Sequence, residues 1–67
     1  MKLDVMKIKM ILAKKEMNQV DLAVACGVER QQINGILYRG TCSLKTLGRI
    51  AKALGVDPAE ILKKEEE

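Results

Sequence analysis

The 67-residue sequence contains no histidine, no tryptophan, no phenylalanine and only two cysteines. Tyr38 is its only aromatic residue, so the core must be built from Leu, Ile, Val, Ala and Met. RNA-binding and single-strand-binding modules stack bases on several aromatic rings, and one tyrosine is too few for such a platform. The composition therefore disfavours both classes of nucleic-acid binder.

The scarcity of histidine and cysteine also excludes an ordinary zinc site, because two possible ligands cannot fill four positions. Cys26 belongs to an apolar helix face and Cys42 to a loop, and we expect both thiols to be free. The chain lacks paired catalytic carboxylates and a phosphate-cradling glycine loop. We therefore expect no enzyme activity, no cofactor and no small-molecule ligand.

Long apolar runs are missing as well. The longest are too short for a transmembrane helix, and the N-terminus lacks the apolar stretch of a signal peptide, so we expect a cytoplasmic protein that does not enter a membrane. The length predicts one domain over residues 1–67, with a core over about 5–62 and an acidic, frayed tail over 63–67.

The net charge of +3 combines a basic body with an acidic end. Residues 1–54 carry ten Lys or Arg against four Asp or Glu, a balance of +6, whereas residues 55–67 carry two against five, a balance of −3. A basic surface is expected of a nucleic-acid binder, although surface charges are more often simply solvated. Charge alone therefore does not assign the function.

Capping residues and apolar spacing predict an all-α protein of five helices. The expected N-caps are Asp4, Asn18, Glu29, Ser43 and Asp57. The expected helices span about 5–15, 19–26, 30 to about 38 and 44–54, and a fifth begins at Pro58. The apolar positions expected to face the core in the first, fourth and fifth helices are Val5, Ile8, Ile11, Leu12, Leu44, Leu47, Ile50, Ala51, Leu54, Ile61 and Leu62.

Residues 19–38 predict a helix-turn-helix, because two short amphipathic helices meet at a single glycine. Leu22 and Cys26 share one helix face, as the buried positions of the following helix do. Ala23 is small enough to let the next helix cross closely, and Val28 can fill the corner between the two helices. Gly27 suits the left-handed residue that ends the first of them.

The second of these helices has a polar face that its apolar residues, Ile33, Ile36 and Leu37, leave uncovered. In the major groove, Arg can bind guanine, and Gln and Asn can bind adenine, each through paired hydrogen bonds. Gly35 leaves room for a close approach to DNA, or else it merely weakens the helix. The expected base-reading residues are Arg30, Gln31, Gln32, Asn34 and Gly35.

The segments NQVDLAVACGV, INGI and SLKTLGRIAKALGVDPAEIL resemble the Cro/C1-type, or Xre-like, helix-turn-helix family of phage, plasmid and bacterial transcriptional regulators. The resemblance covers the chain from about residue 5 to residue 62. It implies a compact five-helix, lambda-repressor-like domain with the helix-turn-helix at helices 2 and 3. The third helix would lie in the major groove of double-stranded DNA, and the N-terminus of the second would meet a phosphate.

Gln19 matches the family's backbone-contacting glutamine, and Arg30, Gln31 and Gln32 match its base-reading positions. Further expected backbone contacts are Tyr38, Arg39, Lys45 and Arg49, each of which is otherwise a solvated side chain or, for Tyr38, a ring that seals the loop. Two departures from the family pattern stand out: Glu29 replaces the usual Ser or Thr, and Gly40 lies one residue later than usual.

The expected function is sequence-specific regulation of transcription by a repressor that binds a pseudo-palindromic operator as a homodimer. One recognition helix covers only a few base pairs, so a second copy supplies the missing affinity and specificity. The fifth helix and the end of the fourth are candidate dimer surfaces. The alternative is a helix-turn-helix scaffold that serves as a protein-interaction module, such as an antitoxin or an adaptor.

Overall fold

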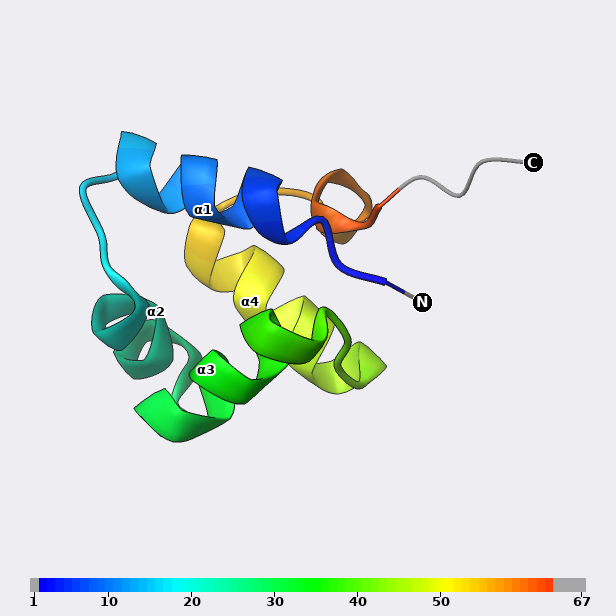
Figure 1. Cartoon of the computed structure of the whole chain (residues 1–67). Coiled ribbons are helices and arrows are strands. Elements are labelled where there is room, and N and C mark those ends of the chain that lie inside the picture. The colour runs from blue at the N-terminus through cyan, green and yellow to red at the C-terminus, as the bar shows by residue number, and fades with distance from the viewer. Residues whose placement is uncertain (1, 64–67) are drawn as a thin grey trace.

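The computed structural model describes residues 2–63, which form four α-helices followed by a 3-10 turn. The elements are α1 (Val5–Lys14), α2 (Gln19–Cys26), α3 (Arg30–Arg39), α4 (Leu44–Leu54) and η1 (Pro58–Ile61) (Figure 1). The all-α prediction is confirmed. Of the predicted acidic tail, only Lys63 lies within the described residues, and 64–67 fall outside them. No helix within residues 2–63 is long and apolar enough to cross a bilayer.

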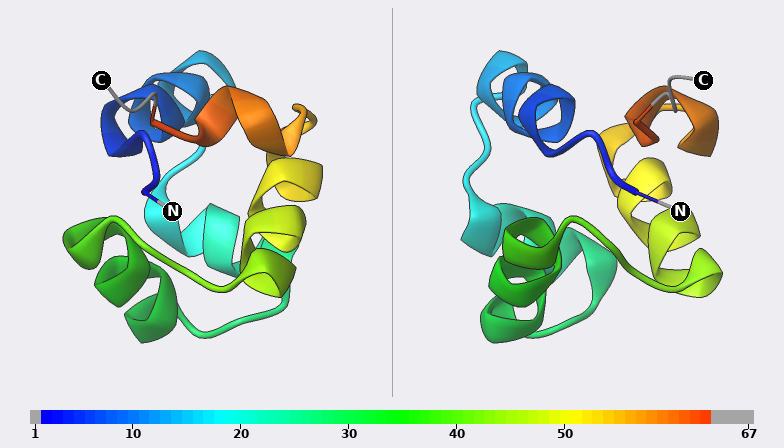
Figure 2. Two further views of the ribbon diagram at one scale, coloured as in Figure 1. Left: turned by 90° about the vertical axis from the view of Figure 1, so that its right-hand side faces the viewer. Right: turned by 45° about the vertical axis from the view of Figure 1, so that its right-hand side comes forward.

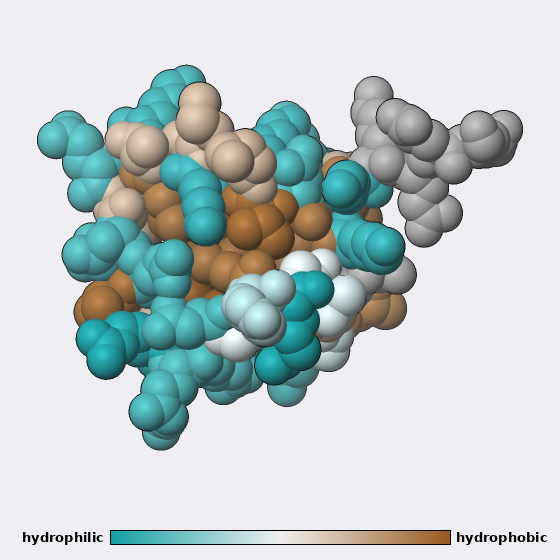
Figure 3. All heavy atoms as spheres, viewed as in Figure 1, coloured by the Kyte–Doolittle hydropathy of each residue, from teal (hydrophilic) through white to brown (hydrophobic). Residues whose placement is uncertain are grey.

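The helices are arranged around α4, which connects the two ends of the molecule. At one end α2 packs against both α3 and α4, and at the other η1 packs against α4 and α1. Figures 1 and 2 show α1 and η1 together on the side opposite the α2–α3 pair. On the face shown in Figure 3, apolar side chains gather between α1 and the α2–α3 pair.

The helix ends follow the capping pattern of the sequence. Asp4, Asn18, Ser43 and Asp57 each accept a bond from a backbone amide two or three residues ahead, at distances of 2.9–3.2 Å. Asp21 also returns a bond to the amide of Asn18, which completes a capping box. All five predicted N-cap residues are therefore confirmed, four of them with a side-chain bond, and Gly27 and Gly55 end α2 and α4 in the left-handed conformation, both at φ +72°.

The core draws fully buried side chains from every element: Ile8, Leu22, Ile33, Ile50, Leu54 and Ile61. Val5, Ile11, Val28 and Leu62 are only partly buried and pack around this core. The prediction for Leu44 is wrong, because this side chain is 76% exposed. It lies at the first residue of α4, and helical periodicity gives its direction without showing whether another element lies over it.

The prediction of a fifth helix is also wrong, because η1 is a four-residue 3-10 turn. The chain becomes extended at Leu62, which forms an isolated antiparallel bridge with Leu3. The amide of Asp4 donates to the carbonyl of Ile61 at 2.8 Å, and the amide of Lys63 donates to the carbonyl of Lys2 at 2.9 Å. This pairing with the N-terminal residues ends the helical geometry after one turn.

Two other predicted boundaries differ by one residue. α1 ends at Lys14 instead of Lys15, just before Glu16 takes a positive φ of 57°. α3 continues to Arg39, because Gly40 is its left-handed end at φ +73° and donates its amide to the carbonyl of Ile36 at 2.7 Å. The displaced glycine thus lengthens α3 by one residue.

Candidate nucleic-acid interface

The turn between α2 and α3 has the predicted geometry. Gly27 reverses the chain, and the next amide, that of Val28, donates to the carbonyl of Ala23 at 3.0 Å. Ala23 is 2% exposed, so its small side chain sits inside the corner as expected. The half-buried Val28 packs against the core cluster two residues before α3 begins.

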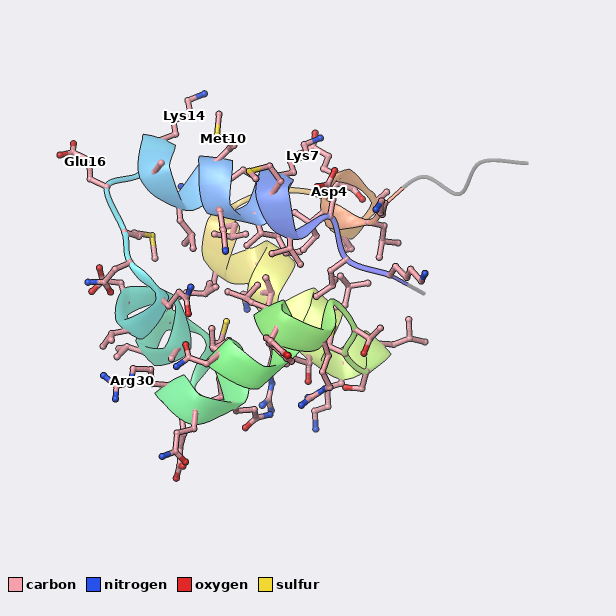
Figure 4. The ribbon with its side chains drawn as sticks, viewed as in Figure 1. Asp4, Lys7, Met10, Lys14, Glu16 and Arg30 are labelled. Carbon is pink, nitrogen blue, oxygen red and sulfur yellow. The ribbon has the colours of Figure 1, made fainter. Side chains whose placement is uncertain are left out.

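α3 has one buried face and one exposed face. Ile33, Ile36 and Leu37 are buried, which leaves the polar side chains on the solvent side. The residues that face solvent are Arg30, Gln31, Gln32, Asn34, Tyr38 and Arg39, and Gly35 lies half-buried among them. We call this surface the α3 strip. Figure 4 shows Arg30 at the start of α3, extending away from the body of the protein.

Tyr38 is 92% exposed. The alternative role predicted for it, a partly buried ring that seals the loop, is therefore wrong. An exposed phenol at the far end of α3 presents both a ring and a hydroxyl to whatever contacts the α3 strip.

Arg39 folds back over Gly35, a contact that the sequence analysis missed. A Cβ placed on Gly35 would lie 3.0 Å from Nη1 of Arg39 and 3.7 Å from its Cζ. The two residues are four apart, and side chains on a helix lean toward its N-terminus. The spacing of Gly35 and Arg39 could have predicted this contact, because a long side chain four residues after a glycine can lie on the helix surface that the glycine leaves uncovered.

The N-terminus of α3 starts at the predicted N-cap residue but is not capped by its side chain. Glu29 is the N-cap residue in an extended conformation, but its carboxylate makes no capping bond within the described residues. Its carbonyl accepts from the amides of Gln32 and Ile33 at 3.0 and 3.2 Å. The amides of Arg30 and Gln31 have no acceptor inside the helix, so this end of α3 carries partial positive charge.

The N-terminus of α2, unlike that of α3, is capped by side chains. The capping box uses the amides of Asn18 and Asp21, and those of Gln19 and Val20 have no acceptor inside the helix. The side chain of Gln19 is half-buried beside them. Two free amides at the positive end of a helix are suited to an anionic oxygen.

Lys45 and Arg49 both lie exposed on α4, outside the α3 strip. Arg49 is near the end of α2: burial raises the pKa of the Cys26 thiol, and the charge of Arg49 partly opposes that effect. Burial also raises the pKa of Cys42. Both thiols are free, as predicted.

A family model described as the Cro/C1-type HTH DNA-binding domain matches residues 7–67 of the chain. This match confirms the resemblance seen in the sequence and covers nearly the whole chain. Searches among curated proteins and among solved structures found no match. The matched family is non-catalytic, so the expectation that the chain is not an enzyme is confirmed.

Proposed function

Because the chain belongs to the Cro/C1-type family of helix-turn-helix DNA-binding domains, we propose that it is a sequence-specific repressor that binds a pseudo-palindromic operator as a homodimer. Binding at a promoter excludes polymerase by occupying the site. The observation that carries the proposal is the α3 strip, where guanidinium and amide side chains stand exposed above a fully packed inner face.

In this proposal α3 lies in the major groove. Arg30 donates to guanine, and Gln31, Gln32 and Asn34 pair with the edges of adenine. The support for these roles is position, since all four side chains are exposed on one helix whose opposite face is buried. Residues near the start of a recognition helix contact base edges most directly, which favours Arg30 and Gln31.

Phosphate contacts fix the position of the domain on the duplex. We assign these to Gln19 with the free amides of α2, to the hydroxyl of Tyr38, and to Lys45 and Arg49. Each of the four side chains reaches solvent at least in part, and two of them carry positive charge. Arg49 lies close to Cys26 at the end of α2.

The homodimer follows from the size of the contact. Two copies with their recognition helices about 34 Å apart reach successive major grooves on one side of the duplex. The surface formed by η1 and the end of α4 is the candidate interface, because it lies away from the α3 strip (Figure 2). A dimer through this surface leaves both recognition helices free.

The proposal is tested by in vitro selection from random duplex DNA at physiological salt, followed by affinity measurements across a salt series. We expect an enriched motif with two inverted half-sites, and log K falling with log salt by about 0.9 for each phosphate neutralised. A selection that enriches no motif would reject specific DNA binding. A partner protein that still binds after Arg30→Ala and Gln31→Ala would then favour the interaction module.

A further inference from the structure

Gly35 is at an unexpected position, because a glycine inside a helix lowers its stability relative to alanine. Its backbone does not require glycine, since it has ordinary helical geometry, whereas Gly27, Gly40 and Gly55 have a positive φ. Nor is the space above it empty, because Nη1 of Arg39 lies 3.0 Å from the place where a Cβ would be, closer than a side chain at residue 35 would ordinarily allow. The absent side chain therefore makes room for part of this chain as well as for a ligand.

The direction of Arg39 follows from the helix. Gln31, Gly35 and Arg39 are spaced by four residues, so they form one ridge along the exposed side of α3. Arg39 is the last residue of α3, and its side chain runs back along this ridge. Its charge is thereby placed near the middle of the α3 strip, about one turn before its own Cα.

We infer that Gly35 is a positioning residue that holds the guanidinium of Arg39 among the base-reading side chains, so that Arg39 reads a guanine instead of gripping a phosphate. The inference rests on the proposed function. A guanidinium lying along the groove-facing ridge can present two parallel N–H groups to O6 and N7 of guanine. α3 then offers one arginine at its start, Arg30, and a second drawn back from its end.

The substitution Gly35→Ala distinguishes a role in positioning Arg39 from a role in the stability of the helix. The atom it displaces is the far end of a flexible side chain, so Gly35→Ala is tolerated and favours the helix. We expect the melting temperature to rise by roughly 2–8 °C while specific DNA binding weakens. Gly48 on α4 is the matched control, because it is exposed with nothing within 4 Å of its Cβ position. Gly48→Ala should stabilise the protein and leave DNA binding unchanged.

The experiment is a double-mutant cycle on the duplex that the wild-type protein selects. Affinities are measured for wild type, Gly35→Ala, Arg39→Ala and the double variant, on that duplex, on copies with each guanine replaced, and on random DNA. We expect each single variant to lose between about 5- and 150-fold on the selected duplex and little on random DNA. In the Arg39→Ala background, Gly35→Ala should cause no further loss, and one guanine should lose its importance in both variants.

Each other outcome overturns the inference in a different way. An equal loss from Gly35→Ala with and without Arg39 would show that glycine serves only the close approach of DNA. Equal losses of Arg39→Ala on selected and random DNA, or full rescue by Arg39→Lys, would make Arg39 a phosphate contact. A wild-type chain that enriches no duplex would reject the proposed function itself, and the inference with it.

Discussion

α3 and α4 have nearly the same length, ten and eleven residues, but they are stabilised differently. α4 begins with a hydroxyl cap from Ser43 and buries four apolar side chains. α3 begins at Glu29 without a side-chain cap and buries three apolar side chains, and each helix has one interior glycine, Gly35 in α3 and Gly48 in α4. The fold therefore depends more on α4, and the exposed side of α3 is the surface that we propose for DNA.

In α3, two residues that are unfavourable for helix stability lie at or beside the positions where DNA binding is proposed. A cap at residue 29 or an alanine at residue 35 would stabilise α3 at no cost to its packing. Proteins commonly give up stability in this way at functional sites. The difference between the two helices therefore predicts opposite responses to substitution, with stability lost from α4 and DNA binding lost from α3.

The largest expected effect is the loss of stability when a buried side chain of α4 is shortened. Ile50 is fully buried, so Ile50→Ala should lower the free energy of unfolding by about 2–5 kcal/mol, and Ile50→Val by about 0.5–1.5 kcal/mol. Asn34→Ala on the exposed side of α3 should change it by less than about 0.5 kcal/mol. Urea unfolding followed by circular dichroism measures all three. Similar losses from Ile50→Val and Asn34→Ala would remove the distinction between the helices.

The next effect concerns DNA affinity. Arg30→Ala should weaken binding to the selected duplex by about 1–3 kcal/mol and binding to random DNA much less, because a base contact is lost. Lys52→Ala, which removes an exposed charge of the same sign from α4, should change both affinities little. Fluorescence anisotropy with the two duplexes gives the four values. If Lys52→Ala weakened binding as much as Arg30→Ala does, the DNA would contact α4 as well as α3, and the assignment of α3 as the recognition helix would be contradicted.

Substitutions at the two helix N-caps should have a smaller effect on stability, and the effects should be opposite in sign for α3 and α4. Glu29→Ser should stabilise the protein by about 0.5–2 kcal/mol, because it supplies the missing acceptor for the first turn of α3. Ser43→Ala should destabilise it by a similar amount of about 0.5–2 kcal/mol. Thermal unfolding records both. If Glu29→Ser is neutral, the first turn of α3 is already satisfied by water.

Glu29→Ser should also tighten DNA binding, because it removes a negative charge directly before Arg30, at the end of α3 proposed to enter the groove of the polyanionic duplex. The increase should shrink as salt is raised. Glu29→Gln is the matched control, since it removes the charge without supplying a better cap. Unchanged affinity in both variants would mean that the Glu29 carboxylate is turned away from the DNA.

The smallest expected effect depends on pH. Burial raises the pKa of the Cys26 thiol, so folding favours its protonated form. That contribution is present in full at neutral pH and is lost as the pH rises through the alkaline pKa of the folded thiol. Cys26→Ala should therefore lose less stability than wild type between neutral and alkaline pH, as measured by urea unfolding. Identical losses would show that the thiol stays protonated or is solvated in both states.

The sequence predicts the bounds of α2 and α4 to the residue, because caps such as Asn18 and Ser43 and the glycines that end each helix act locally. It misses the pairing of Leu3 with Leu62, since that contact joins the two ends of the chain. An isolated leucine shows no periodicity, so nothing marks Leu3 as buried. The same pairing replaces the expected fifth helix with η1.

For the candidate site too, local features could be predicted from the sequence and contacts that depend on the folded structure could not. Which residues share the exposed side of α3 could be predicted, because helical geometry and the buried Ile33 and Ile36 determine it. How a long side chain lies on that surface could not, and the contact between Arg39 and Gly35 appears only in the structure. The position of Arg49 beside Cys26 depends on how α4 crosses α2, which no local pattern encodes.

The most direct test of the account is a map of backbone amide chemical shifts in the free protein and in its complex with the selected duplex. We predict the largest changes along α3, from Arg30 to Arg39, and at the first turn of α2 around Gln19, with small changes in α1. Changes concentrated in α1, with α3 unaffected, would contradict the assignment of α3 as the recognition helix.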